Sequence, residues 1–240
     1  MTVLPTPRRQ RGIEILDGND VDHVVRARSH RDIAMSNALF GGTRAWRSEL
    51  DAIMHLLPPR ATLLDIGTGT GEATAIAADR CARAAVQLTT FGLDHDAGLV
   101  TSARRHAHHG VCASALALPF PDASLDIVNC AQVAHHFEDA ELRQLLREMH
   151  RVARLRVIVS DLRRSWAAVA GLWMASFPLR FHPISRHDGV VSILRGFTRT
   201  ELGDLVYDSV GTRPVVRRHL GFRLSASWSP AHAPTGAGHP

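Results

Sequence analysis

The chain has 240 residues and a formal net charge of +5, and all 28 of its Lys and Arg residues are arginine. This length allows one large domain or two small ones with a full core, and 45% hydrophobic residues is ordinary for a globular protein. No apolar run reaches the roughly 20 residues of a membrane span, and the arginines are scattered rather than clustered. We therefore expect no membrane span and no nucleic-acid partner.

The two ends of the chain and the cysteines indicate the cellular compartment. Residues 1–12 contain Pro and Arg but no apolar signal core, so we predict a disordered tail and no secretory signal. Residues 230–240 consist mainly of Pro, Gly, Ala and His, and we predict a second disordered tail there. Cys81, Cys112 and Cys130 lack the spacing of metal ligands. These features predict a cytoplasmic protein with reduced thiols and no metal.

The first predicted elements are helices. Apolar residues recur at helical spacing over residues 20–57, and the glycine pair at 41–42 interrupts the pattern, so we predict two helices. We assign residues 13–58 to an N-terminal helical lid or cap. This cap either covers a ligand pocket or packs on the edge of the following core, which spans residues 59–229.

From residue 62 onward, strand and helix patterns alternate, which is typical of a parallel sheet with helices on both faces. The predicted fold class is α/β: a Rossmann-like, doubly wound, mostly parallel seven-stranded sheet with an antiparallel last strand pair. The predicted strands are 62–66, 86–93, 111–113, 125–130, 157–160, 214–220 and 222–228. The predicted helices are 71–83, 96–108, 139–152, 161–177 and 198–206. Residues 178–195 are predicted as a connection, within a helical insertion over 161–196.

A glycine-rich loop follows the first strand. Residues 63–72 read LLDIGTGTGE, so an apolar strand passes through a turn with three alternate glycines into a helix. This is the layout of a nucleotide-type cofactor site, because glycine lets backbone and ligand approach closely. A dinucleotide fingerprint would need Gly or Ala at position 72, where Glu72 stands. Asp65 and Glu72 would repel a pyrophosphate and favour a cationic ligand.

Asp94 ends the second predicted strand and lies 23 residues after Gly71. A doubly wound fold brings the end of this strand beside the glycine loop. A carboxylate at this position can accept hydrogen bonds from both ribose hydroxyls of a nucleotide-type cofactor. Asp94 is therefore a predicted cofactor ligand.

The glycine loop resembles motif I of the class I S-adenosylmethionine (SAM) methyltransferases, which holds the amino-acid end of SAM. Residues 114–128, SALALPFPDASLDIV, resemble the D-A-x-x-L-P-F-P-D-x-S-F-D-x-V block of the small-molecule enzymes of this class. Residues 34–47, AMSNALFGGTRAWR, resemble the pre-core segment of the ubiquinone/menaquinone C-methyltransferase type. The resemblance implies SAM as cofactor and S-adenosylhomocysteine (SAH) as product.

The resemblance also implies the cofactor-binding residues. They are Asp65, Gly67, Thr68, Gly69, Thr70, Gly71, Asp94, His95, Ser114, Ala115, Leu116, Cys130 and Ala131. The chain departs from the family at Ser114, where an Asp usually binds the adenine amino group. The Ser114 hydroxyl or the Ala115 backbone could still meet the adenine, and residues 118–120 are expected to form its wall. A Pro-Gly-Gly turn that usually follows the helix at 139–152 is also absent.

Two histidines are candidates for catalysis. His135 and His136 follow the fourth strand, at the sheet edge where reacting groups collect. An acceptor hydroxyl or activated carbon must lose a proton, and histidine is the commonest base for this step. Either residue is a candidate general base, and His187 with Asp188 is a second candidate pair.

Three hypotheses for the function remain open at this stage. The first is methyl transfer from SAM to a small aromatic or apolar acceptor, such as a phenol, a quinol or a polyketide-like natural product. The second is an NAD(P)-dependent oxidoreductase, and the third is a methyltransferase-like binding subunit without turnover. Large apolar residues in the predicted helix 161–177 could wall an acceptor pocket, form a homodimer face or belong to the core.

Overall fold

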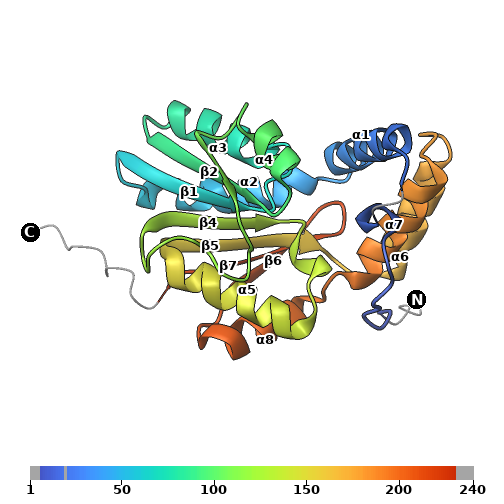
Figure 1. The fold of residues 1–240 in the computed structure, drawn as a ribbon. Coiled ribbons are helices and arrows are strands. Elements are labelled where there is room, and N and C mark those ends of the chain that lie inside the picture. Colours follow the sequence, from blue (N-terminus) through green and yellow to red (C-terminus); the bar gives the residue numbers. More distant parts are fainter. Residues whose placement is uncertain (1–5, 19–20, 231–240) are drawn as a thin grey trace, which may run out of the picture.

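The computed structural model describes residues 6–18 and 21–230, and its centre is a seven-stranded sheet (Figure 1). The strands are β1 Arg60–Ile66, β2 Gln87–Asp94, β3 His109–Cys112, β4 Leu125–Ala131, β5 Ala153–Leu162, β6 Val215–His219 and β7 Arg223–Trp228. Their order across the sheet is β3-β2-β1-β4-β5-β7-β6. Strands β1 to β5 are parallel, whereas β7 pairs antiparallel with β5 and β6. The predicted fold class and its antiparallel last pair are confirmed.

Helices pack on both faces of this sheet. They are α1 His23–Leu39, α2 Gly42–Ile53, α3 Glu72–Arg83, α4 Ala97–Ala103, α5 Asp139–Val152, α6 Trp166–Ser176, α7 Pro183–Arg195 and α8 Arg199–Val210, with short turns η1 Ile15–Asp17, η2 Met54–Leu56 and η3 Ala134–His136. Side chains of α2 and α3 form one core with Ile127, and side chains of α5 and α8 form the other core with Val128. Neighbouring residues of β4 thus point to opposite faces, as expected for a strand buried on both sides.

The boundaries differ from prediction mainly after β5. Helix α5 has the predicted bounds and passes directly into β5, and α8 carries the predicted capping box between Thr198 and Glu201. Strand β5 continues to Leu162, so α6 begins at Trp166 instead of residue 161. The prediction of a connection over 178–195 is wrong, because α7 occupies most of it. His182 caps this helix and proline stands in its first turn, a start signal that the irregular apolar pattern of the segment obscures.

The N-terminal segment is a further correction. The predicted disordered tail over 1–12 is wrong for residues 6–12, while residues 1–5 and 231–240 of the two predicted tails lie outside the described residues. Arg9 donates a hydrogen bond to the Arg195 carbonyl and another to Asp139, and the Gln10 amide donates to the Leu194 carbonyl. These partners lie on α5 and α7, far away in sequence, so local composition could not reveal them.

The two predicted helices of the cap take different positions. Helix α2 packs on the face of the sheet against β5 and β7. Helix α1 lies with α6 and α7 beyond the carboxyl ends of the parallel strands (Figure 1). Ligands of doubly wound sheets bind at this edge, so α1, α6 and α7 form a helical cover over the expected site. No helix of the described part of the chain is long and apolar enough to cross a bilayer.

A buried carboxylate ties α2 to the last two strands. Glu49 Oε1 accepts a hydrogen bond from Ser225 Oγ at 2.6 Å, and Oε2 accepts from Ser227 Oγ at 2.7 Å and Arg217 Nη1 at 2.6 Å. Burial alone would raise the pKa of Glu49, but these donors hold it below the ordinary value. The carboxylate therefore stays charged and keeps α2 against the hairpin.

The corner between α1 and α2 lies against the β6–β7 turn. Gly221 has a φ of +75°, and a Cβ there would lie 1.9 Å from the Phe40 carbonyl oxygen. Gly41, in the opposing corner, has a φ of +71°, and its Cβ would lie 3.2 Å from the Leu220 carbonyl oxygen. Only glycine both adopts this positive φ readily and lacks the Cβ that would clash with Phe40. Gly221 therefore permits the close approach of the β6–β7 turn to the corner between α1 and α2.

The substitution Gly221→Ala tests this contact. It should lower the free energy of unfolding by about 3 kcal/mol, because the clash with Phe40 adds to a left-handed backbone strain of about 1 kcal/mol. The matched control is Gly211→Ala, where φ is +70° and no atom lies within 4 Å of the added Cβ. Strain alone predicts a loss of about 1 kcal/mol for the control. Urea unfolding measures both losses, and equal losses would contradict the packing argument.

Candidate active site

A cavity of about 1200 Å³ opens at the carboxyl edge of the sheet. Its walls come from the glycine loop after β1, the end of β2, the segment after β4, the cover helices and the N-terminal segment around η1. These elements converge where a doubly wound fold binds its ligands. This cavity is the candidate active site.

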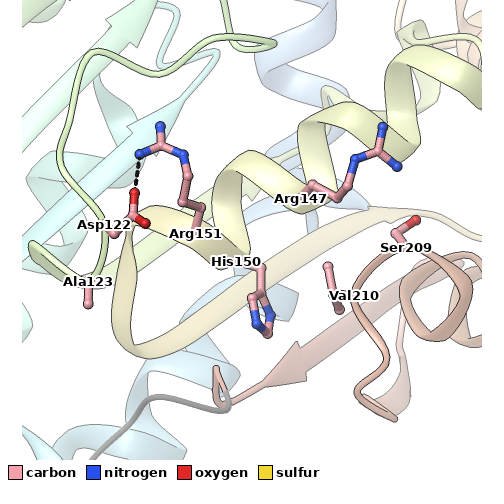
Figure 2. A pocket seen from close by; sticks show the side chains of 7 residues that line it. All are labelled: Asp122, Ala123, Arg147, His150, Arg151, Ser209 and Val210. Carbon is pink, nitrogen blue, oxygen red and sulfur yellow. Dashed lines mark hydrogen bonds and ion pairs between the residues drawn. The ribbon is translucent and has the colours of Figure 1, made fainter.

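A second cavity, of about 500 Å³, lies between the end of α5 and the end of α8 (Figure 2). It is near the start of β4 and β5, on the opposite edge of the sheet from the glycine loop. Arg151, which lines it, already pairs with Asp122 at 2.8 Å and with Glu148 at 2.7 Å. This cavity is therefore remote from the predicted site.

The three glycines of the loop serve different purposes. Gly67 has a φ of +67°, and a Cβ there would lie 2.4 Å from Val133 Cγ2. Gly69 has a φ of +53°, and a Cβ there would meet no atom within 4 Å, because this face of the loop borders the cavity. Gly71 has a φ of +85° and is the N-cap of α3, and a Cβ there would lie 3.1 Å from the Ala103 carbonyl oxygen. The loop thus leaves open space for a ligand at Gly69.

Asp94 lies beside this loop, as predicted. Its Oδ2 accepts from the Gly69 amide at 3.3 Å, and its Oδ1 accepts from the Asp96 amide at 3.1 Å. Each carboxylate oxygen has two lone pairs, so each retains one for a ligand hydroxyl. His95 Nδ1 lies 3.3 Å from Oδ1, with its ring exposed at the mouth of the cavity. The geometry suits recognition of a diol.

Asp65 is buried where β1 enters the loop. Its Oδ1 accepts from Asn129 Nδ2 at 2.7 Å, a partner on β4 that sequence reasoning missed. Burial raises the pKa of Asp65 to about 6, although the hydrogen bond from Asn129 opposes the rise. A buried carboxylate with no cationic partner gains from a positive charge nearby.

Most of the predicted cofactor residues line this cavity, but not all of them. Those that do are Asp65, Gly67, Thr68, Gly69, Thr70, Asp94, His95 and Ala131. Gly71 lies beneath the loop, and Cys130 is fully buried in the core. Cys130 belongs to the core because alternate residues of β4 face opposite sides.

The structure does not bring the predicted adenine contacts to the cavity lining. Ser114 Oγ accepts from the Leu116 amide at 3.2 Å, so the segment with Ala115 folds into a local turn. The predicted wall at residues 118–120 is likewise absent from the cavity lining. Leu118 is in the core, with its amide bonded to Glu148, and Phe120 packs edge-on against Phe91. Ser114 and Leu118 are therefore engaged in hydrogen bonds within the protein, and Phe120 packs against another aromatic ring.

His135 is a buried histidine held by a buried carboxylate. Its Nδ1 lies 2.7 Å from Asp161 Oδ1, and its amide donates to Asp161 Oδ2 at 3.0 Å. Burial would raise the pKa of Asp161, but His135 holds it below the ordinary value. The carboxylate fixes the proton on Nδ1, which leaves Nε2 as an acceptor. His135 lines the cavity, so this imidazole can receive a proton there.

His136 lies in a different environment. Its ring is 4.2 Å from the ring of His135, and its Nδ1 is 3.7 Å from Asp17 Oδ2 and 3.4 Å from Arg195 Nη1. Burial would lower the pKa of His136, but the hydrogen bond and charge of Asp17 raise it above the ordinary value, with Glu14 and Asp161 contributing. His136 therefore belongs to an ion-pair cluster near the surface.

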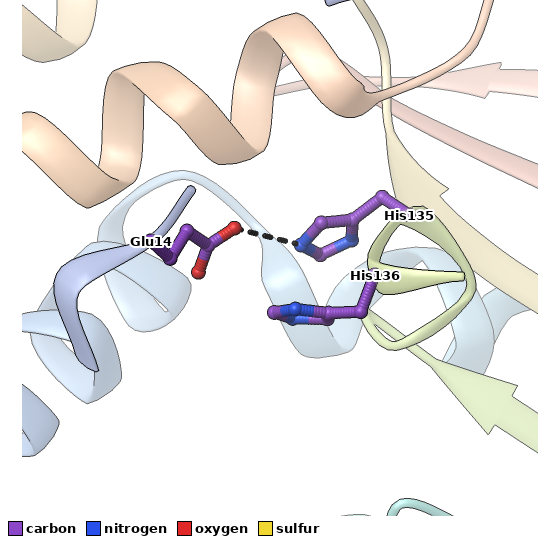
Figure 3. A group of neighbouring side chains, drawn as sticks. All are labelled: Glu14, His135 and His136. Atoms are coloured by element: carbon purple, nitrogen blue, oxygen red, sulfur yellow. Dashed lines mark ion pairs between the residues drawn. The ribbon is translucent and has the colours of Figure 1, made fainter. Parts of the chain in front are cut away.

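Glu14, His135 and His136 present ligand atoms within 4.8 Å of one another, as a metal site would require (Figure 3). The Glu14 carboxylate already accepts from Arg195 Nη1 at 3.0 Å and from Ser192 Oγ at 2.9 Å. A guanidinium at this distance supplies the positive charge that a metal would bring. The cluster is satisfied as an ion-pair network, and the absence of a metal stays a prediction.

Sequence reasoning missed Glu14 and Asp17, which the N-terminal segment brings to this network. Asp188 on α7 anchors this segment, because its two carboxylate oxygens accept from the Ile15 and Leu16 amides, each at 2.9 Å. The predicted pairing of His187 with Asp188 occurs at 2.8 Å, but His187 is half exposed and does not line the cavity. Residues 13–18 carry no periodic pattern that would have indicated this position.

The four largest apolar side chains in and after α6 do not line the cavity. Trp166, Trp173, Met174 and Phe177 are all at least 41% exposed, whereas Ala168, Gly171 and Leu172 line the cavity. The hypotheses of a pocket wall and of a core position are therefore wrong for these four residues. A homodimer face at α6 stays a prediction.

The strand order, the antiparallel last pair and the glycine loop at the carboxyl edge define a protein of the Rossmann-like methyltransferase fold. Residues 64–158 match the family model of the methyltransferase domain, in agreement with the predicted family and enzyme class. The prediction that SAM is the cofactor is consistent with this match.

Individual proteins support the same assignment. A demethylmenaquinone methyltransferase from Thermus thermophilus is 34% identical over 120 residues, which cover 47% of this chain and 51% of that protein. The chain thus matches about half the length of this curated relative. A Nostoc punctiforme structure provisionally described as an O-methyltransferase has a TM-score of 0.59 at 17% identity, covering 85% of this chain and 59% of that one. A SAM-dependent methyltransferase from Thermotoga maritima has a TM-score of 0.54 at 18% identity, covering 83% and 97%. At these identities the structures establish the fold.

The raised pKa of Asp65 predicts a pH dependence of stability. The folded protein holds this proton more tightly than the unfolded chain, whose Asp pKa is about 3.9. Wild-type stability should therefore fall as the pH rises from about 4 through about 6. Asp65→Asn cannot ionise, so it should gain about 2 kcal/mol relative to wild type between pH ~4.5 and ~7.5. Urea unfolding at both values measures the gain, and a difference that does not change with pH would contradict it.

Proposed function

We propose that this protein transfers a methyl group from SAM to a small acceptor and releases SAH. The observation that carries the proposal is the presence in one cavity of the glycine loop with Asp94 and of His135, which is hydrogen-bonded to the buried Asp161. The methyltransferase-domain match over residues 64–158 supports it.

The loop side of the cavity fits the chemistry of SAM. Bound SAM supplies an electrophilic methyl group on a positively charged sulfur. Asp94 would accept hydrogen bonds from the ribose hydroxyls with the lone pairs left by its two amide donors. The buried carboxylate of Asp65, which has no cationic partner among the described residues, would gain from the positive charge. The open space at Gly69 would receive the part of the cofactor that lies against the backbone.

His135 is the proposed general base. Its Nδ1–H is directed to Asp161, so Nε2 can take a proton from an acceptor hydroxyl or activated carbon. Asp161 would then stabilise the imidazolium, as a carboxylate does in a catalytic triad. His136, the other candidate, is engaged with Asp17 and Arg195. The cover helices would exclude water and orient the acceptor for in-line displacement.

The acceptor side of the cavity favours an apolar ring. Its lining includes Phe40, Leu172, Phe181 and Ile193, which come from the cover. We propose an aromatic acceptor such as a phenol, a quinol or a polyketide-like compound. The relative from Thermus thermophilus, which is named for demethylmenaquinone, supports a ring acceptor. The wall is apolar in the way expected of a small-molecule pocket.

The alternative functions are less well supported. A pyrophosphate would lie at the start of α3, and Glu72 lines the cavity there, which disfavours an NAD(P) oxidoreductase. A binding subunit without turnover would lack any use for the His135–Asp161 pair. A cytoplasmic location, the absence of a nucleic-acid partner and a homodimer stay predictions.

Titration calorimetry tests the cofactor. Wild type should bind SAH and should not bind NAD(P), and Asp94→Ala should weaken SAH binding about 100-fold or more, because two hydrogen bonds to a buried carboxylate are lost. Asp208→Ala is the control, since this residue lies on the exposed side of α8 and contacts only Arg143 among the described residues. Tight NAD(P) binding, or unchanged SAH affinity in Asp94→Ala, would contradict the proposed site.

Steady-state kinetics on a panel of phenols and quinols test the base. His135→Gln should lower kcat by about 10²–10⁴-fold, and SAH affinity should stay the same. Asp161→Asn should also lower kcat, because the imidazole loses its fixed tautomer. If His136→Gln lowered kcat more than His135→Gln did, the base would be His136.

A further inference from the structure

Arg223 is a buried cation with an incomplete set of partners. It stands at the first position of β7 and is only 3% exposed. Its Nη2 donates to Asn37 Oδ1 at 3.2 Å, whereas Nε and Nη1 have no hydrogen-bond partner within the described residues. The residue lines the cavity of the candidate active site. Buried arginines are normally paired, so an acceptor is missing here.

The described residues do not provide that acceptor. Asp161 contributes a negative charge, but its carboxylate accepts from the imidazole and amide of His135 and from the Leu162 amide. Burial lowers the pKa of Arg223 to about 10, while the charge of Asp161 opposes the change. Arg223 is therefore still cationic at neutral pH, with two donor nitrogens free.

Arg223 is also held in place. Its backbone pairs with Leu162 on one side and His219 on the other. The preceding turn is fixed by Gly221, whose α-carbon is in contact with Phe40, and Asn37 holds one end of the guanidinium. The side chain therefore cannot move freely into solvent, and its unpaired donors belong to the shape of the cavity.

A second donor in the same cavity is unpaired. Trp46 on α2 is 1% exposed, lines the cavity, and its Nε1 has no partner among the described residues. Asp65 and Asp94, in contrast, lie at the ends of β1 and β2, on the other side of β4 and β5 from Arg223. At least two strands thus separate Arg223 from these two carboxylates.

We propose that Arg223 binds a carboxylate inside the active-site cavity. A carboxylate offers two acceptor oxygens and one negative charge, which match the free donors and the single charge of the guanidinium. The carboxylate can come from the amino-acid end of the cofactor or from an acidic aromatic acceptor. Both sources rest on the proposed function, which identifies the cavity.

Two pairs of ligands distinguish the sources. SAH carries a carboxylate that 5′-methylthioadenosine lacks, and 4-hydroxybenzoate carries one that 4-hydroxybenzamide lacks. Calorimetry with all four ligands is carried out on wild type, on Arg223→Met and on Arg218→Met. Arg218 is the matched control because it lies on the same hairpin with an exposed side chain.

Arg223→Met should weaken the binding of one carboxylate about tenfold or more and leave its neutral partner unchanged. A loss confined to SAH assigns Arg223 to the cofactor, and a loss confined to 4-hydroxybenzoate assigns it to the acceptor. If neither carboxylate loses affinity, or if wild type binds neither more tightly than its neutral partner, the proposal is overturned.

Two further results keep the test independent of folding and of the proposed function. Arg223→Met should unfold at the same temperature as wild type or higher, because an unpaired buried charge is removed. Should this variant not fold, Arg223→Lys, which keeps the charge with fewer donors, should show an intermediate loss on the same carboxylate. If SAH and 5′-methylthioadenosine both fail to bind wild type, the proposed function fails, whereas the benzoate pair still decides the role of Arg223.

Discussion

The hydrogen bonds that Asp161 accepts hold together the end of the cavity where chemistry is expected. The carboxylate is buried at the end of β5 and receives the imidazole and the amide of His135 and the amide of Leu162. A buried charge is costly unless hydrogen bonds compensate it, and Asp161 accepts three. Its charge also acts on Arg223 across the β5–β7 pair. The orientation of the proposed base and the end of β5 thus depend on one side chain, which also opposes the lowering of the pKa of Arg223.

The parallel core could be predicted because its signals are local. Strand and helix periods, the glycine loop and the acid after β2 lie in short stretches, and their positions at the sheet edge follow from the topology. The pair His135–His136 could be placed after β4 for the same reason. Which ring meets Asp161 depends on a contact across 26 residues, and Arg195 meets Glu14 across 181. No local pattern encodes such contacts.

Two kinds of bonding build the molecule. The sheet and the helices on its faces are held by apolar side chains, as in the cores around Ile127 and Val128. The cover over the cavity has only a smaller apolar cluster, around Leu172, Phe181 and Ile193. Polar contacts add to it, such as those of Asp32 with His182 and Ser185 and of Asp188 with the N-terminal segment. Regions with few apolar contacts open at lower free-energy cost than cores. The cover can therefore open for ligand exchange while the sheet stays intact.

The anchoring of α2 by Glu49 affects the order in which the molecule can be assembled. Its partners Ser225 and Ser227 follow it by 176 and 178 residues, so these hydrogen bonds cannot form until the final hairpin exists. Contacts of such high sequence separation form late, because long loops must close first. During synthesis, the parallel strands can pair while one wall of the cavity is still missing. The ability to bind a ligand therefore arises near the end of folding, after most of the scaffold is in place.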